Sequence, residues 1–323
     1  MMPRRFRVVS VVGARPQFIK AAPISQALSN VAHEVLVHTG QHYDREMSAV
    51  FFQELQLPEP AFNLGVGSGS HGWQTGQMLT RIEEVLLVER PDWVLVYGDT
   101  NSTLAGALAA VKLQLPLAHV EAGLRSYSRR MPEEHNRVLT DHSSDLLFCP
   151  TQAAVDNLAR EGISRGVHFV GDVMYDAILH NAGLAEGSSH LLKRLKLTSG
   201  RFALATVHRP RNTDDLARLE GILGALQTIA AQKPVVLPIH PRTRKAMDAL
   251  GYKPGPGLQV IAPVSYLDML MLEKHAALIL TDSGGVQKEA FFFSVPCLTL
   301  REETEWPETV QSGWNRLVGA DQA

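Results

Sequence analysis

The sequence predicts an α/β fold of two Rossmann-like domains that face each other across a cleft. Apolar strands alternate with helical segments along most of the chain, which is typical of parallel sheets with helices on both faces. This alternation pauses between about residues 182 and 200 and then starts again. Each half also begins with an apolar strand that runs into an Arg-Pro turn, at Arg15–Pro16 and Arg209–Pro210. Two similar halves therefore follow one another.

The first half, residues 1–180, holds five apolar runs of strand length and three longer amphipathic segments of helix length. The predicted strands are Arg7–Val12, Glu34–His38, Trp93–Tyr97, Leu117–Val120 and Leu146–Cys149. The predicted helices are Thr75–Glu89, Ala105–Leu113 and Gln152–Glu161.

The second half, residues 201–323, follows a segment of residues 181–200 that is rich in Gly, Ser, Lys and Leu. That segment has no strand signal and predicts a linker with a short helix. The strands predicted after it are Phe202–Val207, Val235–Ile239, Leu258–Ile261, Ala277–Leu280 and Cys297–Leu300. Ligands of open α/β sheets bind beyond the carboxyl ends of the strands, so we expect functional residues there in both halves.

Composition and charge are those of a cytoplasmic enzyme. The 323 residues suffice for two cores, with 45% hydrophobic and 20% charged residues. A net charge of −2 gives no support for a nucleic-acid or membrane partner. The first apolar run is short and meets Gly13, which favours a core strand over a signal peptide or membrane span. The cysteines, Cys149 and Cys297, are expected to be buried reduced thiols.

Residues Thr281–Glu289 hold the motif that tells most about function. The motif follows the apolar run Ala276–Leu280 and opens a predicted helix. A Ser-Gly-Gly turn at a helix N-terminus leaves backbone N–H groups directed at one spot, where the helix dipole favours an anion. Glu289 lies deeper in the helix, where its carboxylate can meet the hydroxyls of a ribose. The pattern indicates a nucleotide diphosphate site, although Ser-Gly-Gly alone is more often an ordinary turn.

Three carboxylates indicate acid/base chemistry in the first domain. Asp99 and Glu121 each end an apolar strand, and Glu133 follows in a segment predicted to be irregular and to fold over that edge. Carboxylates held close together resist sharing full negative charge, so we expect at least one pKa to rise. Such a group transfers protons near neutral pH. For Asp99, capping of a helix that starts at Asn101 is an equally good alternative.

Cations and histidines complete the set of candidate residues. Arg15 and Lys20 follow the first strand and are suited to clamping a phosphate, although as isolated residues they are better explained as solvated surface cations. His208 and His240 close neighbouring strands of the second domain and are expected to face the cleft. The spacing of these histidines and of the two cysteines fits no zinc motif, so we predict no metal.

Taken together, these segments resemble the non-hydrolysing UDP-N-acetylglucosamine 2-epimerase family. The resemblance covers nearly the whole chain, and the order and spacing of its motifs are specific even though no single motif is. The motifs are the Gly13–Gln17 start, Thr39–His42, Gly98–Thr100, His119–Arg125, Pro132–Glu134 with Asn136–Arg137, Thr206–Arg209 and Thr281–Glu289.

The resemblance implies a GT-B-like pair of domains that closes on a UDP-sugar, as a homodimer without NAD or metal. In the family, UDP is eliminated and added back through a 2-acetamidoglucal intermediate, which inverts carbon 2 for cell-envelope polysaccharide synthesis. By position, the implied catalytic residues are Asp99, Glu121, Glu133 and His208. The implied UDP-binding residues are Arg15, Lys20, Arg137, Ser283, Gly284, Gly285 and Glu289. Gln41 and His42 resemble part of a regulatory UDP-GlcNAc site.

Several departures from the family pattern point to a sister branch. Ala14 and Gln17 replace Thr and Glu of many relatives, Trp306 replaces a phosphate-contacting Arg, and Met269 replaces an aromatic near the uracil. These features resemble enzymes that epimerise UDP-2,3-diacetamido-2,3-dideoxyglucuronate. Relatives also continue past Gly319 by several helices, the last of which packs on the first domain, so we expect closure or stability to suffer without them.

Two other classes of protein share parts of this pattern. A GT-B glycosyltransferase has the same fold and UDP site, but it needs no cluster of three carboxylates for proton transfer at carbon 2. A UDP-sugar-binding protein without turnover fits the short C-terminal region. An epimerase that acts on UDP-GlcNAc is the function that the sequence favours.

Overall fold

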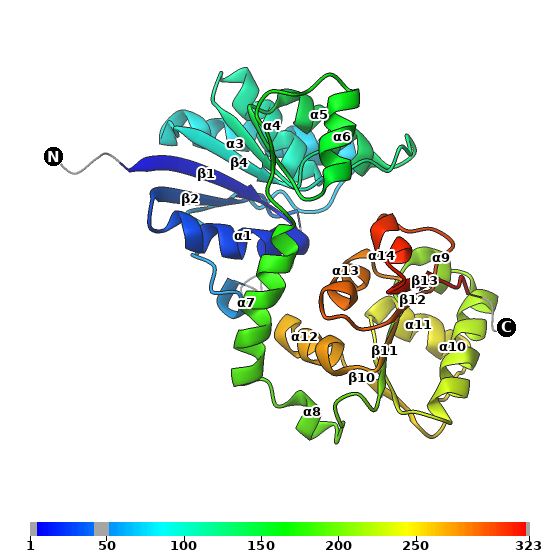
Figure 1. Cartoon of the computed structure of the whole chain (residues 1–323). Coiled ribbons are helices and arrows are strands. Elements are labelled where there is room, and N and C mark those ends of the chain that lie inside the picture. Colours follow the sequence, from blue (N-terminus) through cyan, green and yellow to red (C-terminus); the bar gives the residue numbers. More distant parts are fainter. Residues whose placement is uncertain (1–4, 42–51, 321–323) are drawn as a thin grey trace. The chain divides into compact units, whose positions relative to one another are not determined.

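The computed structural model of the chain describes residues 5–41 and 52–320 (Figure 1). The chain forms two compact units, unit 1 up to Ala177 and unit 2 from Ile178. Each unit contains one parallel sheet, which confirms the predicted α/β class. The boundary between the units lies within helix α7 (Val173–Ser188), and α8 (Leu191–Arg194) follows, so both helices contribute to residues 181–200.

The sheet of unit 1 has seven parallel strands in the order β3-β2-β1-β4-β5-β6-β7. The strands are β1 (Phe6–Val12), β2 (Ala32–His38), β3 (Phe62–Asn63), β4 (Trp93–Tyr97), β5 (Leu117–Val120), β6 (Leu146–Cys149) and β7 (Val167–Phe169). Five of them are the predicted strands. The edge strands β3 and β7 have two and three residues, too few to leave an apolar pattern.

Helices cover both faces of this sheet. They are α1 (Arg15–Leu28), α3 (His71–Glu89), α4 (Asn101–Lys112), α5 (Pro132–Ser143) and α6 (Gln152–Arg160). Figure 1 shows α1 on the opposite side of the sheet from α3 and α4. On the side of α3 and α4, the core joins Val9 and Val96 of the sheet to Met78 of α3 and Ala109 of α4. Alternate strand residues face opposite sides, and burial on both sides produces the continuous apolar runs seen in the sequence.

Unit 2 repeats this plan with six parallel strands in the order β10-β9-β8-β11-β12-β13. The strands are β8 (Ala203–Thr206), β9 (Val235–Pro238), β10 (Leu258–Ile261), β11 (Leu278–Thr281), β12 (Cys297–Thr299) and β13 (Asn315–Leu317). The helices are α9 (Pro210–Thr213), α10 (Leu216–Ala230), α11 (Pro241–Ala249), α12 (Tyr266–His275), α13 (Gly284–Phe292) and α14 (Pro307–Gln311). Ala203 and Leu204 belong to separate core clusters, as expected for neighbours on opposite faces of a strand.

The strand order reverses once in each sheet, between β1 and β4 in unit 1 and between β8 and β11 in unit 2. The loops that leave the carboxyl ends of these strands diverge at such a point, and ligands of doubly wound sheets bind there. The loops after β1 and β4 carry Arg15 and Asp99, and those after β8 and β11 carry His208 and Ser283. These four predicted site residues therefore lie at the switch points, whereas Glu121 follows β5 and Glu133 and Arg137 belong to the first half of α5.

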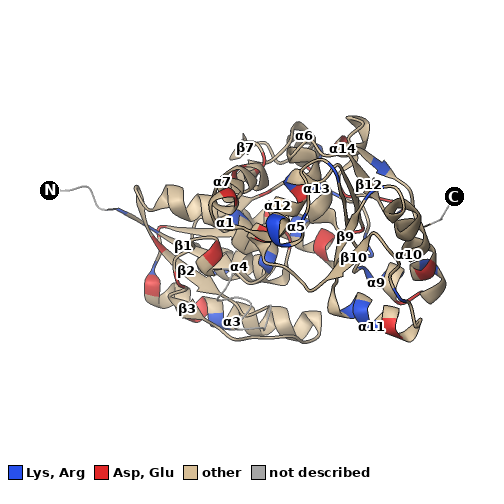
Figure 2. Cartoon of the chain, turned by 90° about the horizontal axis from the view of Figure 1, so that it is seen from below, with Lys and Arg blue, Asp and Glu red and all other residues tan. Residues whose placement is uncertain are grey.

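The charged residues of both units are mixed in sign. Figure 2 shows basic and acidic residues spread over the helices and loops, in line with the small net charge of −2. Within residues 5–41 and 52–320, every helix is too short or too polar to cross a bilayer.

Candidate active site

At the switch point of unit 1, Gln17 of α1 forms hydrogen bonds to both diverging loops, which follow β1 and β4. Its Oε1 accepts hydrogen bonds from the backbone N–H groups of Gly13 (2.8 Å) and Ala14 (3.1 Å). Its Nε2 donates to the Tyr97 carbonyl (2.9 Å) and to Thr103 Oγ1 (3.0 Å). Because a Glu has no N–H to donate to the Tyr97 carbonyl, the amide of Gln17 suits this position.

Glu121 follows β5 in a left-handed backbone conformation, with φ of 70°, which is strained for a residue that is not glycine. Its nearly buried carboxylate forms an ion pair with the ammonium of Lys20 from α1. Burial alone would lower the pKa of Lys20, but the charges of Glu121 and Asp99 outweigh burial and raise the pKa above its usual value. Lys20 is predicted to bind the nucleotide, whereas in the structure its ammonium pairs with the carboxylate of Glu121.

Asp99 faces a cation from α5. Its Oδ2 lies 2.6 Å from Nη2 of Arg137, and its backbone carbonyl accepts a hydrogen bond from Asn136 (2.9 Å). The N-cap of α4 is Thr100, whose hydroxyl accepts the Thr103 N–H. The alternative that Asp99 caps this helix is therefore wrong, and its side chain is available for another role.

Glu133 lies in the first turn of α5, which begins at Pro132, so the prediction of an irregular segment here is wrong. Proline is favoured at the first position of a helix, and this was the signal that could have predicted the helix. The neighbouring Glu134 accepts hydrogen bonds from Ser126 and Tyr127. Burial alone would raise the pKa of Glu134, but these bonds and Arg137 outweigh burial and hold the pKa below its usual value.

The predicted regulatory residues divide between described and undescribed positions. Gln41 lies beside the start of α4, where its Oε1 accepts hydrogen bonds from the N–H (3.2 Å) and hydroxyl (2.7 Å) of Ser102. His42 lies outside the described residues. Arg15 is the first residue of α1 and is exposed at the switch point.

In unit 2, the buried Asp282 orients His208. Its carboxylate accepts hydrogen bonds from the backbone N–H groups of His208 and Arg209 and from the Asn212 side chain, and it lies 3.2 Å from His208 Nδ1. Burial alone would raise the pKa of Asp282, but His208 and the backbone donors outweigh burial and lower it. The sequence contains Asp282 within the motif, but only the strand pairing of β8 with β11 reveals its role.

The ring of His240 lies tilted beside that of His208, with 5.8 Å between the ring centroids. The two residues follow β9 and β8, which are neighbours in the sheet, as predicted. Burial, and then the charges of His208 and Arg242, lower the pKa of His240. His240 therefore favours the neutral form near neutral pH.

The N-terminus of α13 forms the predicted turn. Ser283 is the N-cap, and the helix starts with Gly284 and Gly285. A Cβ added at Gly285 would meet only Ser283 Oγ, at 3.9 Å, so a ligand can approach the backbone there. Glu289 is buried in the same helix.

Trp306 packs against this turn. Its indole N–H donates to the Gly284 carbonyl (3.0 Å), and the ammonium of Lys288 lies 4.0 Å from the ring centroid. Lys288 also forms an ion pair with Glu308 (3.1 Å). Trp306 therefore places an aromatic ring beside the helix N-terminus.

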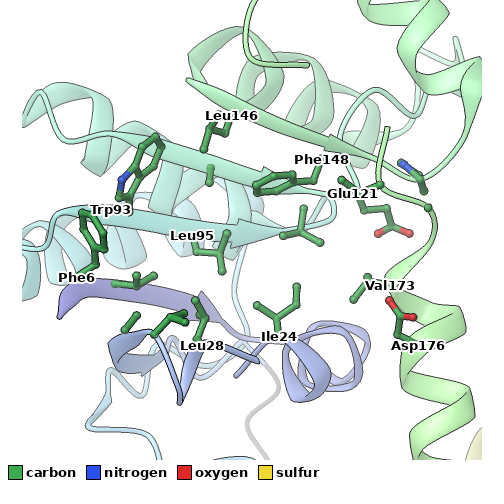
Figure 3. Close-up of a pocket in the computed structure, with 18 residues that line it drawn as sticks. Phe6, Ile24, Leu28, Trp93, Leu95, Glu121, Leu146, Phe148, Val173 and Asp176 are labelled. Carbon is green, nitrogen blue, oxygen red and sulfur yellow. The ribbon is translucent and has the colours of Figure 1, made fainter. Parts of the chain in front are cut away.

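A pocket of about 650 Å³ lies within unit 1, between the sheet, α1 and the start of α7 (Figure 3). Leu95 and Phe148 point into it, and Glu121 and Asp176 lie at one end. None of its lining residues in the described part of the chain is Lys or Arg. The pocket is therefore unsuited to a nucleotide diphosphate, for which the cations of the switch point are better placed.

Comparison with known proteins identifies the family. A profile described as UDP-N-acetylglucosamine 2-epimerase matches residues 26–323. The chain belongs to this family. A UDP-N-acetylglucosamine 2-epimerase homolog from Methanococcus maripaludis is 55% identical over 320 residues, covering 98% of this chain and 89% of that protein.

Two further members of the UDP-N-acetylglucosamine 2-epimerase family are informative. The UDP-2,3-diacetamido-2,3-dideoxy-D-glucuronate 2-epimerase of Pseudomonas aeruginosa is 53% identical over 320 residues, covering 97% of this chain and 88% of that protein. A crystal structure of the Methanocaldococcus jannaschii UDP-GlcNAc 2-epimerase, in complex with UDP-GlcNAc and UDP, has a TM-score of 0.86 at 47% identity. It covers 99% of this chain and 90% of that chain. These matches confirm the predicted family and its enzyme class, UDP-sugar 2-epimerase.

Proposed function

We propose that this chain interconverts UDP-N-acetylglucosamine and UDP-N-acetylmannosamine without hydrolysis. The observation that carries the proposal is the strained Glu121, whose carboxylate lies on Lys20 beside the Gly98–Asp99 turn at the switch point of unit 1. Backbone strain of this kind persists where a side chain must be held in one place for function.

In the proposed reaction, a carboxylate removes the proton from carbon 2 while the bond from carbon 1 to UDP breaks. The electron pair of the C–H bond forms the double bond of 2-acetamidoglucal, and UDP leaves with the electrons of the C–O bond. UDP then adds back to carbon 1 as a proton reaches the opposite face of carbon 2. Two acid/base groups are needed, and Asp99, Glu121 and Glu133 supply candidates in unit 1.

The departing UDP needs stabilisation of its negative charge. We assign this role to Arg15 and Arg137 in unit 1 and to the Ser283-Gly284-Gly285 turn in unit 2. His208, which is oriented by Asp282, is the further group that we place at the reacting centre. Lys20 supports Glu121 in this scheme and contributes to UDP binding through the same charge.

A second candidate substrate is UDP-2,3-diacetamido-2,3-dideoxyglucuronate. The P. aeruginosa relative named for that substrate is nearly as similar as the M. maripaludis protein. Trp306, which packs on the proposed anion-binding turn, and Met269 are among the departures that resemble the sister branch. The reaction at carbon 2 is the same for both substrates.

Proton NMR in D₂O, with each nucleotide sugar in turn, tests the proposal. Formation of the epimer with deuterium at carbon 2 from UDP-GlcNAc supports it. Deuterium incorporation from only the diacetamido uronate establishes the second candidate. No exchange with either substrate contradicts both and leaves a protein that binds UDP-sugars without turnover.

We further propose that the enzyme is a cytoplasmic homodimer that needs no cofactor and serves cell-envelope polysaccharide synthesis. Large apolar side chains exposed on α3, α4 and α5 support self-association, since exposed apolar residues on neighbouring helices mark interfaces. They are Trp73, Leu87, Val88, Val111 and Leu139. Sedimentation equilibrium that shows only monomer at micromolar concentration would contradict the dimer.

A further inference from the structure

The imidazole of His119, in β5, is completely buried and has an acceptor at each nitrogen. Nδ1 lies 2.7 Å from Asp141 Oδ1, and Nε2 lies 2.7 Å from the carbonyl oxygen of Gly98. A carbonyl oxygen can only accept a hydrogen bond, and so can an ionised carboxylate. Both contacts are satisfied as hydrogen bonds only when both ring nitrogens carry protons.

Asp141 of α5 contacts the chain on both sides of Glu121. Its Oδ1 accepts from His119, and its Oδ2 accepts from the Gly123 N–H (3.1 Å) and from Arg125 Nη1 (2.7 Å). Burial alone would raise the pKa of Asp141, but His119 and Arg125 outweigh burial and lower it. The left-handed residue Glu121 therefore lies in a short turn whose two ends are held by one carboxylate.

The charges around Asp141 also favour a cation at His119. Arg125 lies between Asp141 and Glu161, whose two oxygens accept from its Nε and Nη2 at 2.7 and 2.8 Å. Glu161 is partly exposed and also lies 3.1 Å from His142 Nε2, whereas Asp141 is completely buried and shares its guanidinium with Glu161. A proton on His119 would give Asp141 a second cation. Unpaired charge is strongly disfavoured in a buried site.

The second bond of His119 reaches the turn that carries Asp99. Gly98 has a left-handed φ of 63°, and its N–H donates to the Val120 carbonyl (3.0 Å). A Cβ added to Gly98 would lie 3.3 Å from both Glu121 Oε2 and Lys20 Nζ. His119 thus fixes a backbone segment that lies beside the Lys20–Glu121 pair.

We propose that Asp141 and a protonated His119 are positioning residues. Together they hold Glu121 in its strained conformation, in which it pairs with Lys20, and they hold the Gly98–Asp99 turn beside that pair. The effect on turnover rests on the proposed function of the chain, whereas the protonation of the ring and the geometry of the turn do not.

Proton–nitrogen NMR of the unmodified protein, with labelled histidine rings, tests the first part. The His119 signals are assigned by sequential backbone connectivity through Val120. We expect both ring nitrogens to carry a proton at neutral pH. A neutral ring with one protonated nitrogen overturns the proposal, whether or not the protein has epimerase activity.

The variant Asp141→Asn tests the second part, with Asp145→Asn as a matched control. Asp145 accepts the Leu117 N–H (2.9 Å) at the opposite end of β5, away from Glu121. We expect Asp141→Asn to lower kcat about a hundredfold, as a small misplacement of a reacting group does, with KM and UDP affinity nearly unchanged. Asp145→Asn should keep kcat within about twofold for the same reason, because it leaves the Glu121 turn in place.

Equal losses in the two variants, after correction for the folded fraction, overturn the positioning role. So does a loss of UDP affinity in folded Asp141→Asn that matches its loss of kcat. If the unmodified chain lacks 2-epimerase activity, the proposed function fails. In that case amide hydrogen exchange at Glu121 and Ala122 replaces kcat, and faster exchange in Asp141→Asn than in Asp145→Asn is expected. Equal exchange rates would again overturn the positioning role.

Discussion

Single residues at the switch point of unit 1 are arranged as cation–carboxylate pairs. Glu121 forms an ion pair with Lys20, and Asp99 forms one with Arg137. The cations come from α1 and α5, whereas the two carboxylates follow β5 and β4. Two of the three predicted carboxylates therefore each have a basic partner from another element.

We expect Glu121→Gln to lower turnover by about a hundredfold or more, because it removes a group that transfers protons. UDP affinity, measured by titration calorimetry, should stay nearly unchanged because the residue does not bind the nucleotide. Glu186→Gln is the control, since Glu186 is an exposed carboxylate that pairs with Lys274 in unit 2. A well-folded Glu121→Gln protein with lost UDP affinity would reject the role.

A second prediction at this scale concerns Asp282 and pH. Its folded pKa lies below its usual value, so its stabilising effect is complete above pH of about 4, the ordinary pKa of Asp, and is lost as pH falls through the lower folded pKa. We expect Asp282→Asn to cost about 2–3 kcal/mol at neutral pH, from weakened bonds to a buried charged acceptor. Hydrogen exchange at the amides of β8 and β11 measures the cost. A cost that stays constant down to acid pH would contradict this account.

At the scale of elements, the turn from β1 to α1 is held against two other elements. Thr39 follows β2 and Ser102 lies in the first turn of α4, and their hydroxyls are 2.8 Å apart. A Cβ on Gly13 would overlap both hydroxyl oxygens. Only glycine allows these three elements to meet closely, and this close contact places Arg15 at the start of α1.

We therefore expect Gly13→Ala to destabilise the protein by about 1–3 kcal/mol, the usual cost of overpacking. Gly76→Ala is the matched control, because Gly76 lies within α3 and a Cβ there meets no atom within 4 Å. That variant should gain about 0.5–1 kcal/mol from the higher helix propensity of alanine. Chemical denaturation compares the two, and equal effects would contradict the close contact.

At the scale of the whole molecule, the two units share one plan of strand order. Each sheet reverses its order once, and each carries proposed ligands of the nucleotide after the strands at that point. Proton transfer is assigned mainly to unit 1, and the anion-binding helix N-terminus to unit 2. Variants in each unit therefore test the proposed UDP ligands of that unit separately.

We expect Arg15→Ala in unit 1 to weaken UDP binding by roughly 2–5 kcal/mol, if it leaves a phosphate charge unpaired. Glu289→Gln in unit 2 should weaken UDP binding by about 1.5–3 kcal/mol, because it removes a charged acceptor for ribose hydroxyls. Lys112→Ala is the control, since this exposed lysine ends α4 at the opposite side of the sheet from Arg15. Unchanged UDP affinity in either test variant would remove that residue from the site.

Local patterns were sufficient for much of the fold and for the family. Apolar runs that are buried on both faces identified five strands in each half, and strand-end motifs placed Asp99, Glu121 and His208 at the carboxyl edges of the sheets. The short edge strands β3, β7 and β13 left too little pattern to be seen. The order and spacing of the motifs identified the 2-epimerase family, which the profile over residues 26–323 confirms.

The sequence by itself determined the α/β class, the repeated halves and the residues available for chemistry, because strand length, turn residues and helix starts are local properties. Only the tertiary structure decided which partners those residues have. It paired Lys20 with Glu121 and Asp141 with His119. It also paired Asp99 with Arg137, whereas the sequence allowed Asp99 to cap a helix. These pairs join residues far apart in the chain, so they depend on strand order and on helix packing, which no local pattern encodes.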